Sequence, residues 1–145
     1  MRLAWLALIV TLGVSLVACR STKTGPAGYS LPPHLVSVSP VDGTTISRDE
    51  IQADGITANF KFQVGNGLGR FPSNQIRLYV NMNDVSIKLR WTMTKDLPPS
   101  EGSFKFVPDK PMSPGWKTLR IIYWDMVDNV PYQRYDYVWR INVTK

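Results

Sequence analysis

From residue 34 to residue 145, apolar and polar residues alternate in short runs, which is the pattern of half-buried β-strands. In the clearest run, Ile56, Ala58, Phe60, Phe62 and Val64 fall on one face, and the residues between them are polar or small. Similar runs predict further strands at residues 35–38, 76–80, 85–91, 104–106, 119–124 and 135–143. No stretch with helical periodicity is long enough to predict a helix.

Turn residues separate these runs. Residues 81–84 read Asn-Met-Asn-Asp, which is turn chemistry, so the runs at 76–80 and 85–91 predict a hairpin. Seven short strands separated by Gly, Pro, Asn and Asp clusters predict an all-β chain with a single immunoglobulin-like, or fibronectin III-like, sandwich of about seven strands. This sandwich domain is expected at residues 34–145.

Three turns resemble those of bacterial immunoglobulin-like domains. Pro40-Val-Asp-Gly43 is similar to the turn after their first strand. The segment 111–119 resembles the entry to their sixth strand, with Pro111 where leucine is usual, and the segment 125–129 resembles the turn before their last strand, with Asp128 where glycine is usual. The resemblance implies a sandwich scaffold and carries no catalytic residue.

The start of the chain predicts export. Met1 and Arg2 precede an uncharged apolar run at residues 3–18, which has the layout of a cleaved secretory signal peptide and is shorter than the roughly 20 residues of a permanent spanning helix. A retained signal anchor is the alternative. Residues 20–33 are rich in small, polar and proline residues, so 19–33 is expected to be a flexible tether with a span of roughly 20 Å.

The residues Leu16-Val17-Ala18-Cys19 resemble the lipobox of bacterial lipoproteins. The resemblance implies cleavage between Ala18 and Cys19, a diacylglyceryl thioether on Cys19 and further acylation, with chains such as palmitate, of its new amino group. Two or three acyl chains hold a soluble domain stably on a membrane. Arg20 favours the outer membrane if the host is Gram-negative. The protein is therefore expected in the cell envelope, anchored to the membrane by this lipid.

Composition agrees with an exported, packed domain. The 145 residues contain 43% hydrophobic and 11% aromatic residues, enough for a core. Cys19 is the only cysteine, so no intramolecular disulfide forms, and lipidation explains the lone thiol. The formal net charge of +6 favours association with anionic surfaces such as headgroups or cell-wall polymers. The exported location argues against nucleic acid as a partner.

Outward-facing basic residues of the predicted strands provide a candidate patch for an anionic polymer. A solvated strand face that discourages edge pairing explains the same residues equally well. The patch comprises Lys61, Arg77, Lys88, Arg90, Arg120, Arg134 and Arg140.

Other candidate chemistry is sparse. Asp125, Asp128 and Asn129, with Asp42 or Asp136, provide oxygen ligands for a weak calcium candidate, but Asp and Asn are also ordinary turn residues, and a structural turn is favoured. The chain has two glutamates, in apparent loops, and one histidine, so no catalytic pair, metal or cofactor is predicted and the protein is not expected to be an enzyme.

Several aromatic residues are candidates for sugar stacking or protein contact, although core filling also explains most of them. Trp124 is out of phase with the apolar face of its strand, at Leu119, Ile121 and Tyr123, and is expected to point outward. The set is Tyr29, Tyr79, Trp91, Trp116, Trp124 and Tyr132.

These observations predict a membrane-anchored envelope lipoprotein whose immunoglobulin-like domain is a non-catalytic binding module. The expected partner is another envelope protein or an anionic cell-wall polymer. One alternative is a structural or accessory subunit of a secretion, pilus or surface-layer assembly. A second alternative is a carbohydrate-binding module.

Overall fold

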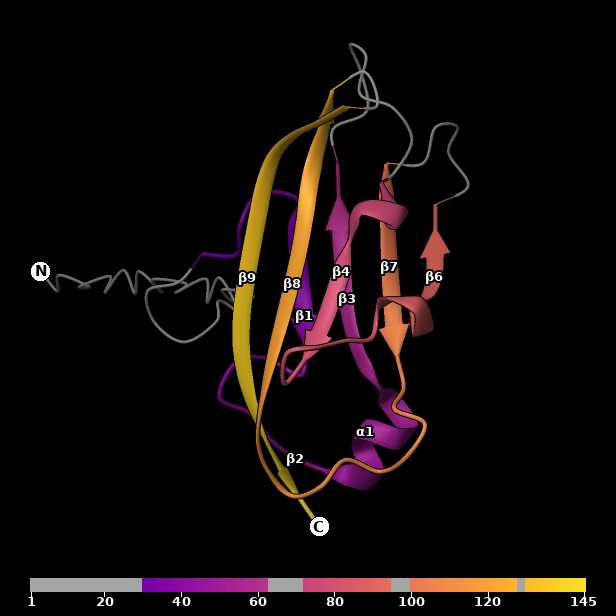
Figure 1. The fold of residues 1–145 in the computed structure, drawn as a ribbon. Helices are drawn as coiled ribbons and strands as arrows, with labels where there is room; N and C mark the ends of the chain where they lie inside the picture. Colours follow the sequence, from indigo (N-terminus) through magenta and orange to yellow (C-terminus); the bar gives the residue numbers. More distant parts are fainter. Residues whose placement is uncertain (1–29, 63–71, 95–99, 128–129) are drawn as a thin grey trace, which may run out of the picture.

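The strands form two sheets that pack face to face (Figure 1). The computed structural model describes residues 30–62, 72–94, 100–127 and 130–145. In the four-stranded sheet the order is β1 (Leu35–Ser39), β3 (Ile56–Lys61), β7 (Glu101–Phe106) and β6 (Arg90–Met93). In the five-stranded sheet it is β2 (Thr45–Ser47), β9 (Val130–Thr144), β8 (Gly115–Val127), β4 (Arg77–Val80) and β5 (Asn83–Asp84). Neighbouring strands are antiparallel except β2, which runs parallel to β9.

Alternation along the strands builds the core between the sheets. Ile56, Ala58 and Phe60 of β3 are all at most 2% exposed, as the sequence predicted, and Phe62 is also buried. The register of β3 against β7 places Phe104 beside Ala58 on the same inward face. From the other sheet, β4, β8 and β9 bury Leu78, Leu119, Ile121, Tyr123, Trp139, Ile141 and Val143. The prediction of an all-β sandwich is confirmed; Val64 lies outside the described residues.

The predicted hairpin between 76–80 and 85–91 is wrong. The chain turns after β4 at Asn81 and Met82, which both have positive φ, but the returning strand β5 lasts only two residues. The backbone N–H of Leu78 then bonds to the Ser86 hydroxyl, and a short 3-10 helix, η2 (Ser86–Lys88), follows. Side-chain hydrogen bonds of this kind compete with a strand ladder. The chain crosses to the other sheet, where β6 pairs with β7, and Ile87 is 94% exposed.

A short helix, α1 (Arg48–Asp54), was not predicted from the sequence. Ser47 caps it: the N–H of Glu50 donates to the Ser47 hydroxyl over 3.2 Å, and the Glu50 carboxylate accepts from the Ser47 N–H over 2.9 Å. The N–H and the hydroxyl of Ser47 both donate to the Glu50 carboxylate and lower the pKa of Glu50, which lies in the first turn and not in a loop. Ile51 anchors the helix and is fully buried. A second 3-10 helix, η1 (Ser73–Gln75), precedes β4.

The two longest strands, β8 and β9, extend beyond the stretches predicted from their apolar residues. They pair from Gly115 opposite Val143 to Val127 opposite Val130, with a register shift that leaves Tyr132 of β9 without a partner residue. Only part of this ladder is covered by the four-stranded sheet, since the first five residues of β9 are exposed. The side of the ladder that faces away from the four-stranded sheet is a long surface that is not needed to form the core.

Candidate functional site

The outer side of the β8–β9 ladder gathers arginine and tryptophan side chains. Odd-numbered residues such as Leu119 and Trp139 are buried in the core, so the even-numbered residues point away from it. The register sets Trp124 opposite Arg134, and β4 adds Arg77 beside Ile122. We call this surface the Arg–Trp face; its members are Arg77, Trp116, Arg120, Trp124, Arg134, Asp136, Val138 and Arg140.

Two arginines lie over the two tryptophans. The guanidinium carbon of Arg140 is 5.1 Å from the centroid of the Trp116 ring, and that of Arg134 is 5.9 Å from the Trp124 ring. Cation–π contacts at exposed sites contribute about 0.5–1 kcal/mol each and fix the planes of both side chains. Trp116 is nevertheless 53% exposed, so one large apolar ring remains open to a partner.

Asp136 organises the centre of the face. Its carboxylate accepts from Arg120 Nε over 2.9 Å and 3.2 Å, forms an ion pair with the same guanidinium, and accepts from Arg134 over 3.4 Å. The hydrogen bond from Arg120 is the main reason that the pKa of Asp136 is lowered. Asp84 lies beside Tyr79 at the edge of the face. The four arginines and Asp136 of the face, counted together with Asp84 at its edge, give a formal net charge of about +2.

The seven basic residues of the predicted patch are divided between the sheets. Lys61 and Arg90 belong to the four-stranded sheet, where Lys61 pairs with Glu101 over 2.7 Å. Lys88 lies in η2 and forms an ion pair with Asp109. One continuous patch of all seven is therefore not formed. The four that share a face are Arg77, Arg120, Arg134 and Arg140.

The candidate aromatic residues do not share one surface either. Trp124 points outward, and the Arg134 guanidinium lies over its ring. This confirms the prediction from the phase of Trp124 in its strand. Tyr132 is 76% exposed near the start of β9. Trp91 instead packs edge-on against Phe104, with ring centroids 5.5 Å apart, and belongs to the core margin. Tyr79 is half-buried on the outer side of β4, and Tyr29 lies outside the described residues.

Asp125, the described member of the calcium candidate, is part of a different network. One carboxylate oxygen lies 2.8 Å from His34 Nε2, and the other accepts from the Tyr135 hydroxyl over 3.1 Å. The His34 ring also stacks on Phe62 with centroids 4.8 Å apart. Burial, followed by the bond to Asp125, raises the pKa of Tyr135. These contacts fasten the first residue of the sandwich to β8 and β9.

The remaining calcium candidates do not join Asp125. Asp42 accepts from the backbone N–H of Arg140 over 2.7 Å, and Asp136 is bound by Arg120. Within the part of the chain that the structure describes, no three His, Cys, Asp or Glu side chains form a metal-binding group. Asp128 and Asn129 lie outside that part, as does Cys19.

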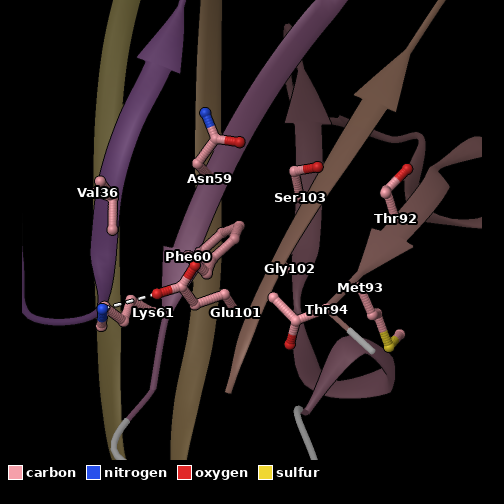
Figure 2. A pocket seen from close by; sticks show the side chains of 10 residues that line it. All are labelled: Val36, Asn59, Phe60, Lys61, Thr92, Met93, Thr94, Glu101, Gly102 and Ser103. Carbon is pink, nitrogen blue, oxygen red and sulfur yellow. Dashed lines mark ion pairs between the residues drawn. The ribbon is translucent and has the colours of Figure 1, made fainter. Parts of the chain in front are cut away.

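The outer side of the four-stranded sheet carries a shallow hollow of about 480 Å³ (Figure 2). Its described lining mixes apolar residues with four uncharged polar ones, and the Lys61–Glu101 pair lies at one side; the polar residues are Asn59, Thr92, Thr94 and Ser103. Asn59 on this wall already donates to the Ser37 hydroxyl over 2.8 Å, whereas the buried Thr94 hydroxyl has no hydrogen-bond partner among the described residues. The hollow offers polar side chains to a small polar group, and among its described lining residues no hydroxyl is hydrogen-bonded to a carboxylate or a histidine.

Comparison with known proteins adds no assignment, since no family model matches the chain and no curated protein or solved structure matches it either. Among the described residues, no helix has the length and apolar character needed to cross a membrane. The Arg–Trp face is accordingly identified from its geometry alone.

Proposed function

We infer that the sandwich is an immunoglobulin-like domain. Such domains place their strands A, B, E and D in one sheet and G, F and C in the other. The order β1-β3-β7-β6 matches the first arrangement, and β9-β8-β4 matches the second. The added strands β2 and β5 extend the five-stranded sheet at its two sides. This strand order supports the assignment more strongly than the strand count does.

We propose that the chain is a cell-envelope lipoprotein, anchored through Cys19, whose domain binds another envelope component without catalysing a reaction. The lipobox-like residues before Cys19 and the tether that follows support the anchor. A flexible tether of this length has an r.m.s. span of roughly 20 Å, so the domain stays near its membrane. The proposed partner is therefore a component that lies at the membrane surface or reaches it.

The Arg–Trp face is the observation that carries the binding proposal. Trp, Tyr and Arg supply most hot-spot energy at protein interfaces, and the face concentrates these residue types on two long, firmly paired strands. Its side chains are already ordered by the Arg140–Trp116 and Arg120–Asp136 contacts. Less side-chain entropy is then lost on binding. The net positive charge favours a partner surface with an excess of carboxylates.

A crosslinking experiment in intact cells tests this proposal. A photo-crosslinking residue replaces Trp116, which is 53% exposed, or Val36, which is 57% exposed on the outer side of the other sheet. We expect one defined adduct from position 116 and none from position 36, because only the first lies on the Arg–Trp face. Equal adducts from both positions, or none from position 116, would reject this face as the binding surface.

Two further results separate the classes of partner. Recovery of one protein in a fixed ratio with the chain would favour the accessory-subunit alternative. Retention on isolated cell wall that is lost at high salt would favour an anionic polymer, because salt screens contacts between exposed charges.

The anchor has its own test. Replacement Cys19→Ser removes the acceptor of the proposed lipid, and Ser21→Ala, two residues further on, is the matched control. We expect the first variant to leave the membrane fraction and the second to remain there, as followed by cell fractionation and by labelling with a palmitate analogue. Membrane retention and labelling of Cys19→Ser would contradict the lipoprotein assignment.

A further inference from the structure

The edge of β9 is open along residues 132–138. In the five-stranded sheet β2 lies beside β9, but it pairs only with residues 142–144. Figure 1 shows β9 as the outermost strand of its sheet over most of its length. Among the described residues, no backbone group forms a hydrogen bond with this edge between Tyr132 and Val138. Within the described part of the chain this strand edge is therefore unpaired, and its regular stretch ends at a bulge, because the pairing with β8 skips Tyr132 between Pro131 and Gln133.

The hydrogen bonds of Arg140 identify the backbone groups that face this edge. Its N–H donates to the Asp42 carboxylate over 2.7 Å, and its carbonyl accepts from the Gly43 N–H over 2.8 Å. Both partners lie on the side of β9 away from β8. Since a strand repeats every two residues, Val138, Asp136 and Arg134 present their N–H and C=O groups in the same direction.

Proteins usually protect such an edge with lysine, proline, a bulge or a covering segment. Pro131 stands at one end of the open segment, and Asp42 and Gly43 cover the other end at Arg140. Between these ends residues 132–138 contain no lysine or proline, and the bulge at Tyr132 leaves residues 133–138 as the regular part of the edge. Tyr132 and Val138 are 76% and 54% exposed. The edge is thus bounded on both sides and is left available between them.

We propose that this edge pairs with the β9 edge of a second copy of the chain in an antiparallel, two-fold arrangement. In one register, Arg134 lies opposite Asp136 of the second copy, and both positions belong to the regular part of β9 beyond the bulge at Tyr132. Opposite charges then meet twice, because the two-fold axis repeats the pair. Cross-strand pairs of opposite charge stabilise a sheet.

The neighbouring registers are less favourable. Only even-numbered residues of this segment turn their N–H and C=O groups toward the open edge. An even-numbered residue must therefore lie opposite an even-numbered residue of the second copy in every possible register. One step in one direction places Asp136 opposite its own copy, and one step in the other direction places Arg134 opposite its own copy. Like charges directly opposite each other destabilise a strand pair. The sequence of the open edge therefore selects one register.

The pairing joins the two five-stranded sheets into one continuous sheet. A two-fold axis perpendicular to that sheet keeps both Arg–Trp faces on the same side, so the dimer presents a doubled face. This inference rests on the sandwich and does not require the lipid anchor or a particular partner. A partner with two binding sites would bind the two faces of the dimer more tightly than it binds the one face of a monomer.

The mass of the purified full-length chain in mild detergent, measured by light scattering over a dilution series, tests the proposal. We expect a dimer for the unmodified chain. Arg134→Glu faces Asp136 of the second copy and should weaken the dimer by at least about tenfold. Arg140→Glu is the matched control, because Arg140 lies on the same strand and also covers a tryptophan, but its backbone edge is occupied. It should remain dimeric.

A second variant tests the edge itself. Val138→Pro removes one edge-facing N–H and leaves the hydrogen bonds to β8 in place, so it should abolish the dimer without lowering the unfolding midpoint by more than a few degrees. A monomeric unmodified chain at about 100 µM, where a dimer with micromolar affinity is nearly complete, would overturn the proposal. So would a dimer that survives both Arg134→Glu and Val138→Pro, since it would use another surface. Loss of the dimer leaves crosslinking at position 116 interpretable, because that position lies away from the open edge.

Discussion

Trp139 connects the last strand to the turn that follows the first one. It is 1% exposed, its ring packs 5.5 Å from the Tyr137 ring, and its Nε1 donates to the carbonyl of Pro40 over 2.9 Å. Pro40 is itself buried, so no solvent can replace this hydrogen bond. The replacement Trp139→Phe keeps an aromatic ring in the core and removes the donor.

The expected loss has two parts. A buried carbonyl that loses its partner costs about 1–3 kcal/mol. The smaller ring also leaves a cavity, and each lost methylene-sized group costs about 1 kcal/mol, so Trp139→Phe should lower the free energy of unfolding by about 2–4 kcal/mol. A domain of ordinary stability, about 5–15 kcal/mol, would still fold.

Urea unfolding followed by circular dichroism measures this loss. Trp116→Phe is the matched control, because Trp116 lies in the same β8–β9 ladder but is 53% exposed. We expect the control to change the free energy of unfolding by less than about 0.5 kcal/mol. If Trp139→Phe were no more damaging than Trp116→Phe, the reasoning that the Pro40 bond closes this side of the sandwich would be refuted.

Three further outcomes are expected from urea or thermal unfolding. Ser47→Ala should cost about 1 kcal/mol, because it removes the side-chain cap of α1, whereas Ser47→Asp should retain most of the stability. Gly55→Ala should cost more than about 1 kcal/mol, since Gly55 has φ of 70° and a Cβ there would lie 2.7 Å from the Phe106 carbonyl oxygen; an unchanged midpoint would contradict this. Arg120 lowers the folded-state pKa of Asp136, so this pair contributes stability above the ordinary pKa of 3.8 and loses it as pH falls through the folded-state value. The free energy of unfolding of Asp136→Asn should therefore fall less steeply below about pH 4 than that of the unmodified chain. An equally steep fall in both would count against this.

Several local features of the fold were predictable from the sequence. The alternation around Ile56 and Phe60 marks the face that is buried, and the phase of Trp124 places it on the outside. Helix α1 also had a readable signal, because Ser47 followed by Glu50 is the pattern of a capping box. Its brevity hid it from a search for helical periodicity. The lipid anchor on Cys19 stays a prediction.

The candidate site was only partly predictable. Alternation indicates that Arg120, Arg134 and Arg140 face outward, but it does not say which outward residues share a sheet. Lys88 was grouped with them because its run resembles a strand that returns beside β4. The hydrogen bond from the Leu78 N–H to the Ser86 hydroxyl ends the strand pairing beside β4, and the chain then crosses to the other sheet. The Arg–Trp face is smaller than the predicted patch for this reason.

By itself, the sequence determined the fold class, because a two-residue period is a local consequence of strand geometry and of which residues avoid water. It also determined which side chains of each long strand face inward. Only the tertiary structure decided the order of strands in each sheet, since that order depends on contacts between residues far apart in the chain. The gathering of Arg134, Asp136 and Trp124 on one face, and the open edge beside them, follow from that order.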